Sequence, residues 1–127
     1  MKIIVTGGAG FIGSAFVRLV LGNGSGHSVI NLDKLTYAGN LDNVAEVSSL
    51  PNYRFVQADI CDARAVESLV GEERPDAIVH FAAESHVDRC IHSPSPSFET
   101  NLSGCFTLLE WARRGAVPWP DLRPKWR

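Results

Sequence analysis

Three glycines at a fixed interval are the first residues in this 127-residue sequence whose spacing indicates a binding function. Gly7, Gly10 and Gly13 follow a short apolar run and precede a segment with apolar residues at helical spacing. Glycine turns the chain tightly and lets a ligand approach the backbone. Free amides at a helix start, here those of Phe11 and Ile12, favour an anion such as a phosphate. The pattern predicts a phosphate-binding loop between a strand and a helix.

An acidic residue strengthens this prediction. Asp33 stands twenty residues after Gly13, at the end of the second apolar run. In dinucleotide-binding folds an acid at about this distance bonds the adenosine ribose hydroxyls, and a carboxylate there repels the 2′-phosphate of NADP. We therefore expect NAD as the cofactor, with Lys34 pointing away from the ribose. A turn without a ligand and a solvated carboxylate are the alternatives.

The elements that must hold these residues alternate along the chain. Strands are predicted at residues 2–6, 28–32, 53–57 and 76–81, and helices at 11–21, 63–70 and 98–113. Such alternation is typical of an α/β fold, here a Rossmann-type parallel sheet with flanking helices, ended after about four strands in the order 3-2-1-4.

Three details of this assignment can be checked. In the first helix the apolar spacing runs through Phe11, Ala15, Phe16, Leu19 and Val20, and Gly71 is expected to stop the second helix. The fourth strand is apolar enough to be buried on both faces. As the edge of the sheet, it would nevertheless lose part of the cover of Ile78, Val79 and Phe81.

Bulk properties limit the function classes. A net charge of -2 gives no reason to expect nucleic acid or an anionic membrane as partner. We expect no membrane span and no secretory signal. Three cysteines without CxxC spacing argue against a disulfide framework, so a cytoplasmic protein is expected, with Cys61 and Cys105 as small core residues.

Four further blocks make the sequence similar to a known family. They are Asp33-Lys34-Leu35-Thr36-Tyr37-Ala38-Gly39-Asn40-Leu41, residues 58–62, residues 80–89, and residues 99–110 with Glu99-Thr100-Asn101-Leu102. With the three-residue glycine interval, they resemble the extended short-chain dehydrogenase/reductases, and among these the dTDP-glucose 4,6-dehydratases, over residues 1–113.

The resemblance implies NAD as cofactor and a nucleotide sugar as a further ligand. It adds cofactor contacts to those of the glycine loop and Asp33, with Ser85 also placed against substrate. The implied additions are Lys34, Leu35, Thr36, Asp59, Ile60, Phe81, Ala82, Ala83, Ser85 and Thr100. The family is homodimeric, and whether this chain dimerises is doubtful.

The implied reaction is a redox-neutral dehydration of dTDP-glucose to dTDP-4-keto-6-deoxyglucose. The family's Tyr-x-x-x-Lys pair and Thr-Asp-Glu string do not occur in these 127 residues. We therefore assign no catalytic residue and expect an N-terminal fragment that binds without catalysing. A related UDP-sugar epimerase or dehydratase, and a non-catalytic nucleotide-binding module, are the alternatives.

The end of the chain differs in character. Residues 115–127 hold three prolines and do not resemble the family, and Arg113 to Arg127 carry five basic residues and one acid. We expect a partial NAD(P)-binding domain at residues 1–114 and a divergent basic Pro/Trp-rich tail at 115–127, from a truncated or frame-shifted gene. A basic tail for an anionic partner is the alternative.

A metal site is a separate possibility. His80, His86, Cys90 and His92 fall within thirteen positions, and all are possible zinc ligands. Their spacing matches no common zinc pattern, and His80 lies inside an apolar strand. We therefore expect no metal.

Overall fold

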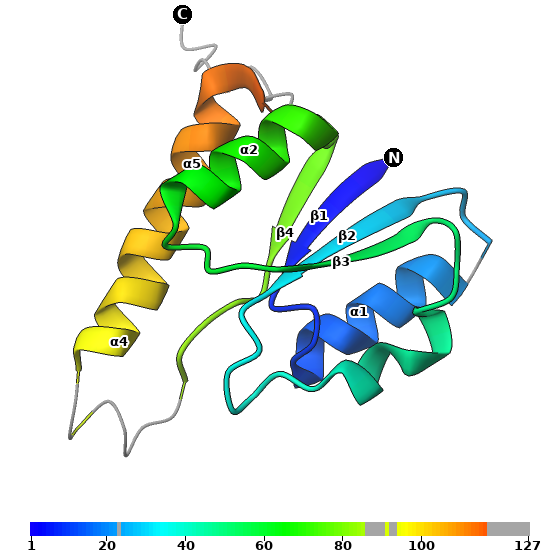
Figure 1. Cartoon of the computed structure of the whole chain (residues 1–127), viewed down its shortest axis with the longest axis horizontal. Coiled ribbons are helices and arrows are strands. Elements are labelled where there is room, and N and C mark those ends of the chain that lie inside the picture. Colours follow the sequence, from blue (N-terminus) through cyan, green and yellow to red (C-terminus); the bar gives the residue numbers. More distant parts are fainter. Residues whose placement is uncertain (23, 86–90, 92–93, 117–127) are drawn as a thin grey trace, which may run out of the picture.

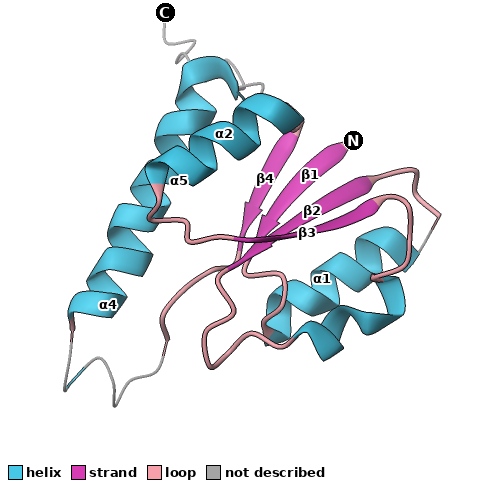
Figure 2. Cartoon of the chain, viewed as in Figure 1, coloured by secondary structure: helices cyan, strands magenta, loops and turns pink. Residues whose placement is uncertain are grey.

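The computed structural model describes the chain except residues 23, 86–90, 92–93 and 117–127. It shows a parallel sheet between two helical layers (Figure 1). One layer holds α1 (Phe11–Gly22) and the 3₁₀ helix η1 (Leu41–Val47). The other holds α2 (Ala63–Glu73) and the long helical run that includes α5 (Cys105–Trp111), as Figure 2 also shows. The predicted α/β class is confirmed.

The sheet has the strand order β3-β2-β1-β4, as predicted. The strands are β1 (Lys2–Thr6), β2 (Ser28–Asp33), β3 (Tyr53–Gln57) and β4 (Ala77–His80), and all pairs are parallel. β1 lies in the middle, with Thr6 beside Leu32 of β2 and His80 of β4. The carboxyl ends of the strands, which carry the predicted site, therefore meet at one edge.

Alternation along the strands makes two hydrophobic cores. Ile3 and Val5 face α1 and η1, whereas Ile4 faces α2 and α5. Successive side chains of a strand point to opposite faces, so the β-branched residues of β1 pack into both cores. The buried Asn31 and Asp33 lie on the α1 face of β2, as their alternation with Ile30 and Leu32 requires.

The predicted apolar face of α1 is only partly right, since Phe16 and Val20 pack against the core whereas Phe11, Ala15 and Leu19 are exposed. Gly13, Ser14, Val17 and Leu21 are buried, whereas Phe11 and Leu19 are 91% and 62% exposed. The cause is Gly13: a Cβ at this position would lie 2.1 Å from the carbonyl oxygen of Gly7. This close backbone contact fixes the rotation of the helix and overrides the apolar spacing.

Other boundaries differ in ways that local chemistry explains. α2 continues through Gly71 and ends at Arg74, which caps it in the left-handed conformation with φ 45°. The unpredicted η1 is nucleated by Asn40, whose side chain accepts a bond of 2.9 Å from the amide of Asp42. β4 is half-buried rather than buried, because β1 is its one neighbour in the described sheet.

The predicted helix at residues 98–113 is longer and irregular. It begins as α4 (Ser95–Phe98), with Pro96 in its first turn, and passes through a π-helical segment, η2 (Glu99–Gly104), into α5. A second π-helical segment, η3 (Ala112–Ala116), follows. π turns within helices are often found at functional sites. None of the described helices is long and apolar enough to span a membrane.

The corrected face of α1 gives a stability prediction. Val17→Ala should lower the free energy of unfolding by about 2 kcal/mol, because Val17 is fully buried. Leu19→Ala, a change of similar size on the exposed face, should alter it by less than about 0.5 kcal/mol. Urea unfolding of the two variants measures both values, and equal losses would contradict the assignment.

Candidate functional site

A cleft of about 460 Å³ opens at the carboxyl ends of the strands. Its lining includes every predicted cofactor residue except Leu35. The predicted residues on it are Gly7, Gly10, Phe11, Ile12, Gly13, Asp33, Lys34, Thr36, Asp59, Ile60, Phe81, Ala82, Ala83, Ser85 and Thr100. Its volume lies within the range of about 300–1,000 Å³ that is usual for ligand sites.

The glycine loop forms the floor of this cleft. Gly7 has φ +69°, and a Cβ there would lie 2.5 Å from the amide nitrogen of Ala82, so both conformation and space require glycine. A Cβ at Gly10 would instead lie 3.3 Å from the Gly7 carbonyl oxygen, which is tight but not prohibitive. Gly7 and Gly13 thus maintain the fold, whereas Gly10 leaves room at the surface of the cleft.

The amides of Phe11 and Ile12 begin α1 beside this floor. The first amides of a helix have no intrahelical acceptor, and the amide of Ser14 is the one that bonds back to the Gly10 carbonyl, at 3.0 Å. A helix N-terminus with such amides is a place for a phosphate.

Asp33 is fixed at the end of β2. Asp33 is 8% exposed, and its carboxylate accepts one amide bond on each oxygen, from Ala9 at 2.9 Å and from Leu35 at 2.8 Å. Each oxygen retains acceptor capacity, since a carboxylate has about four lone-pair sites. Leu35 does not line the cleft; its amide instead holds the acid, with φ 56° at Leu35 itself.

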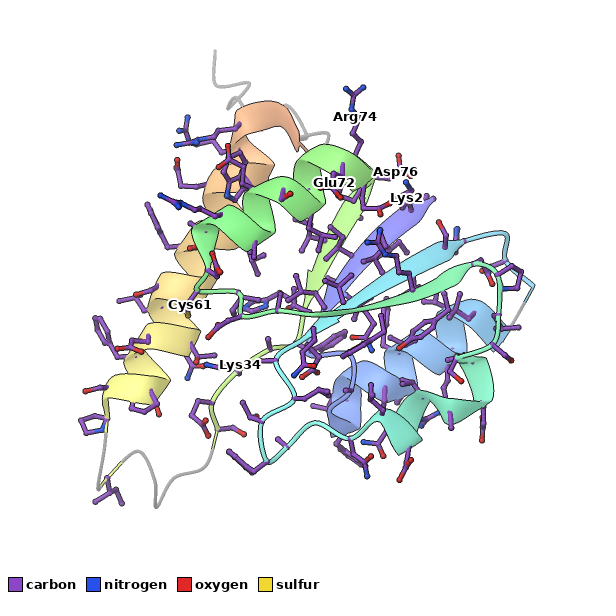
Figure 3. The ribbon with its side chains drawn as sticks, in the orientation of Figure 1. Lys2, Lys34, Cys61, Glu72, Arg74 and Asp76 are labelled. Carbon is purple, nitrogen blue, oxygen red and sulfur yellow. The ribbon has the colours of Figure 1, made fainter. Side chains whose placement is uncertain are left out.

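Lys34 and Asp59 form an ion pair on the lining. Nζ of Lys34 lies 2.5 Å from Oδ2 of Asp59, and the Cys61 amide donates to Oδ1 of Asp59 at 2.9 Å. Burial acts to raise the pKa of Asp59, but the bonds from Lys34 and Cys61 outweigh it and the pKa is lowered. The pKa of Lys34 is raised, mainly by its bond to Asp59. Figure 3 shows Lys34 far from Lys2 and Asp76, which lie at the amino ends of the strands.

The loop after β4 forms the opposite wall. Phe81 packs against Phe16 of α1 with ring centroids 5.4 Å apart. Asn101 of η2 donates to the Glu84 carbonyl at 2.9 Å and accepts from the Glu84 amide at 2.8 Å. Tyr37 donates a hydrogen bond to the Glu84 carboxylate, which links this loop to the one after β2.

The π-helical segment η2 closes the cleft beside the loop after β3. A Cβ at Gly104 would lie 2.5 Å from Cδ1 of Ile60, so this glycine lets η2 approach the loop after β3. Ile60 is 3% exposed and joins the core, while Thr100 of η2 lines the cleft. The thiol of Cys61 donates to the Glu99 carbonyl at 3.2 Å.

Sequence reasoning missed five lining residues and one glycine. The lining residues are Leu32, Ala38, Gly39, Ala58 and Glu84. Gly8 packs against Asn31, where a Cβ would lie 2.2 Å from Oδ1 of Asn31. The Gly7-Gly8 pair was the available signal for this contact, but the fully buried Asn31 could not be foreseen in an apolar strand.

Other site predictions have mixed outcomes. Cys61 and Cys105 are half-buried, so they lie at the margin of the core rather than within it. Nδ1 of His80 lies 2.6 Å from the Thr6 hydroxyl. His86, Cys90 and His92, which were weighed with His80 as possible zinc ligands, lie outside the described residues, as does the tail from residue 117. Within the described residues no His, Cys, Asp and Glu group of metal-binding size occurs.

The glycines differ in what a methyl group would disturb. Gly10→Ala should leave the fold nearly intact and weaken nucleotide binding about tenfold or more, because Gly10 lines the cleft and a methyl group there would occupy space that a ligand needs. Gly13→Ala should unfold or severely destabilise the chain by its clash with Gly7. Thermal melting and titration with NAD separate the two effects, and a Gly10→Ala chain with unchanged affinity would refute the assignment of Gly10.

The chain resembles proteins of one family. The family model for GDP-mannose 4,6 dehydratase matches residues 4–120. A dTDP-glucose 4,6-dehydratase of Shigella flexneri is 57% identical over 113 residues, which are 89% of this chain and 31% of the relative. The chain thus spans about a third of the length of that relative.

Solved structures agree. A dTDP-glucose 4,6-dehydratase of Streptomyces venezuelae, with NAD bound, superposes with a TM-score of 0.82 and 51% identity, over 92% of this chain and 37% of that one. A UDP-glucose 4-epimerase of Thermotoga maritima, with UDP-glucose, gives 0.81 and 34%, over 92% and 35%. The chain therefore belongs to the GDP-mannose 4,6 dehydratase family of nucleotide-sugar enzymes.

Proposed function

We propose that this chain is the NAD-binding portion of a dTDP-glucose 4,6-dehydratase. The observation that carries the proposal is that one cleft is lined by the glycine loop, the buried Asp33 and the loop after β4. The identities of 57% and 51% to the two dTDP-glucose 4,6-dehydratases above, against 34% to the Thermotoga maritima epimerase, favour this substrate class.

The residues present fit NAD. The amides at the start of α1 would hold the pyrophosphate over Gly10, where the absent side chain leaves room. Asp33 would accept the two adenosine ribose hydroxyls with the lone pairs that Ala9 and Leu35 leave free. Asp59 and Ile60 would contact the adenine, and Ser85 would lie near the nicotinamide and the sugar.

These positions indicate which part of the reaction the chain would support. NAD, when bound, supplies the acceptor for the C4 hydride of the glucose unit. This chain's residues bind and orient the cofactor. They include no Tyr-x-x-x-Lys pair to move the C4 hydroxyl proton. We therefore infer that the 127 residues bind NAD but do not turn over dTDP-glucose alone.

Two alternatives make different predictions. A related UDP-sugar epimerase or dehydratase would share the glycine loop and Asp33, and it is favoured by the structural likeness to the UDP-glucose 4-epimerase. A non-catalytic nucleotide-binding module would bind the cofactor and complement no catalytic domain. A graft onto a catalytic partner distinguishes the three.

Cofactor preference is tested by calorimetry on the chain. NAD should bind more tightly than NADP, because an Asp33 carboxylate bonded to the ribose hydroxyls would repel a 2′-phosphate. Asp33→Ala should weaken NAD binding about tenfold, the contribution typical of hydrogen bonds to a charged group. Equal affinity of the unmutated chain for both cofactors would contradict the preference.

Activity is tested by a graft. Residues 1–113 joined to the C-terminal part of a working dTDP-glucose 4,6-dehydratase should produce the 4-keto-6-deoxy sugar from dTDP-glucose. The unmodified chain should show no turnover, since general-base catalysis alone typically contributes about 10²–10⁴-fold. A folded graft that converts UDP-glucose but not dTDP-glucose would move the assignment to the UDP-sugar enzymes. A folded graft that binds NAD but converts neither would favour the binding module.

A further inference from the structure

Lys34 is the one cationic side chain on the lining of the cleft, among the residues that the structure describes. It directly follows Asp33, the predicted acceptor of the ribose hydroxyls. A lysine in this place has a flexible stem of four carbons and an ammonium group that binds phosphate well. From sequence position alone, Lys34 would therefore be suited to neutralise a 2′-phosphate.

The structure directs this ammonium group elsewhere. Nζ of Lys34 bonds Oδ2 of Asp59 at 2.5 Å, and Asp59 is held in turn by the Cys61 amide at 2.9 Å. The two side chains come from different loops, after β2 and after β3. The raised pKa of Lys34 and the lowered pKa of Asp59 have the directions expected of such a pair.

We propose that Asp59 determines the preference for NAD over NADP, by holding the Lys34 ammonium away from the position of a 2′-phosphate. The inference rests on the proposed function, because it concerns the specificity of the same cleft. In this proposal two carboxylates contribute to the discrimination between NAD and NADP. Asp33 repels the phosphate directly, and Asp59 withdraws the cation that would otherwise offset that repulsion.

The Lys34–Asp59 ion pair can be removed by substitution without unfolding the chain. Lys34 and Asp59 side chains are 58% and 30% exposed, so their ion pair contributes little to stability and its loss should leave the fold intact. The amide of an asparagine at position 59 still accepts a hydrogen bond from the Cys61 amide and from an adenine amine. It has no charge with which to hold Lys34.

The test is a double-mutant cycle titrated with NAD and with NADP. Asp59→Asn should tighten NADP binding relative to NAD about fivefold to tenfold, the size of one partly exposed charge-assisted hydrogen bond. Lys34→Met should not improve NADP binding, and adding it to Asp59→Asn should abolish the gain. Glu46→Gln, which removes an exposed carboxylate of η1 outside the cleft lining, controls for net charge and should leave the ratio unchanged.

A second readout does not depend on the cofactor. Carboxyl NMR titration should place the pKa of Asp59 below its ordinary value in the chain and raise it in Lys34→Met, because burial raises this pKa and the bond from Lys34 is the largest of the interactions that lower it. An unmoved pKa would overturn the pairing. The same substitutions in the graft extend the test if the free chain binds too weakly to titrate.

The outcomes separate the two proposals. A chain and graft that bind neither cofactor would refute the proposed function, and the inference with it. If NAD binds but Asp59→Asn leaves the NADP ratio unchanged, the inference alone fails. A gain for Asp59→Asn that survives addition of Lys34→Met would also overturn it, because the gain would then come from lost repulsion rather than from a released cation.

Discussion

The arrangement of the cleft depends on one hydrogen bond, from the Ala9 amide to the Asp33 carboxylate. It connects the glycine loop to the end of β2 at 2.9 Å, in surroundings where the carboxylate is almost fully buried. A buried carboxylate requires donors, because an unpaired charge away from water is costly. The loop must therefore present a backbone amide here, and Ala9 supplies it. The Asn40 amide and the Asn43 side chain both donate to the Ala9 carbonyl, so the following loop is fixed to the same residue.

Much of this arrangement could be predicted from local chemistry. The alternation of strands and helices gave the sheet order, because parallel strands with short crossovers allow few topologies. The cleft could be predicted because it gathers at strand ends, where Gly7, Asp33 and Ala82 each follow or end a strand. Family resemblance supplied the residues with no local signal, such as Thr100 on η2.

What could not be predicted depends on contacts between segments distant in the sequence. The rotation of α1 is fixed by Gly13 against Gly7, and no count of apolar residues reveals a backbone contact. The bond between Lys34 and Asp59 joins loops after different strands, and the expectation that Lys34 points away from the ribose did not identify Asp59 as its partner. The exposure of β4 follows from its position in the sheet rather than from its apolar composition.

Leu35 shows what holding Asp33 in place requires of the chain. Its φ of 56° lies in the left-handed region, which is unfavourable for a residue with a Cβ by about 1–2 kcal/mol. The conformation aims its amide at Oδ1 of Asp33. Conformational strain is thus stored beside Asp33, the residue proposed to bind the ribose. A glycine at position 35 would relieve the strain in the folded chain and at the same time give the unfolded chain more freedom. Folding stability and the preorganisation of the Asp33 carboxylate thus place opposite demands on position 35, and a more stable variant of this domain need not be a tighter binder.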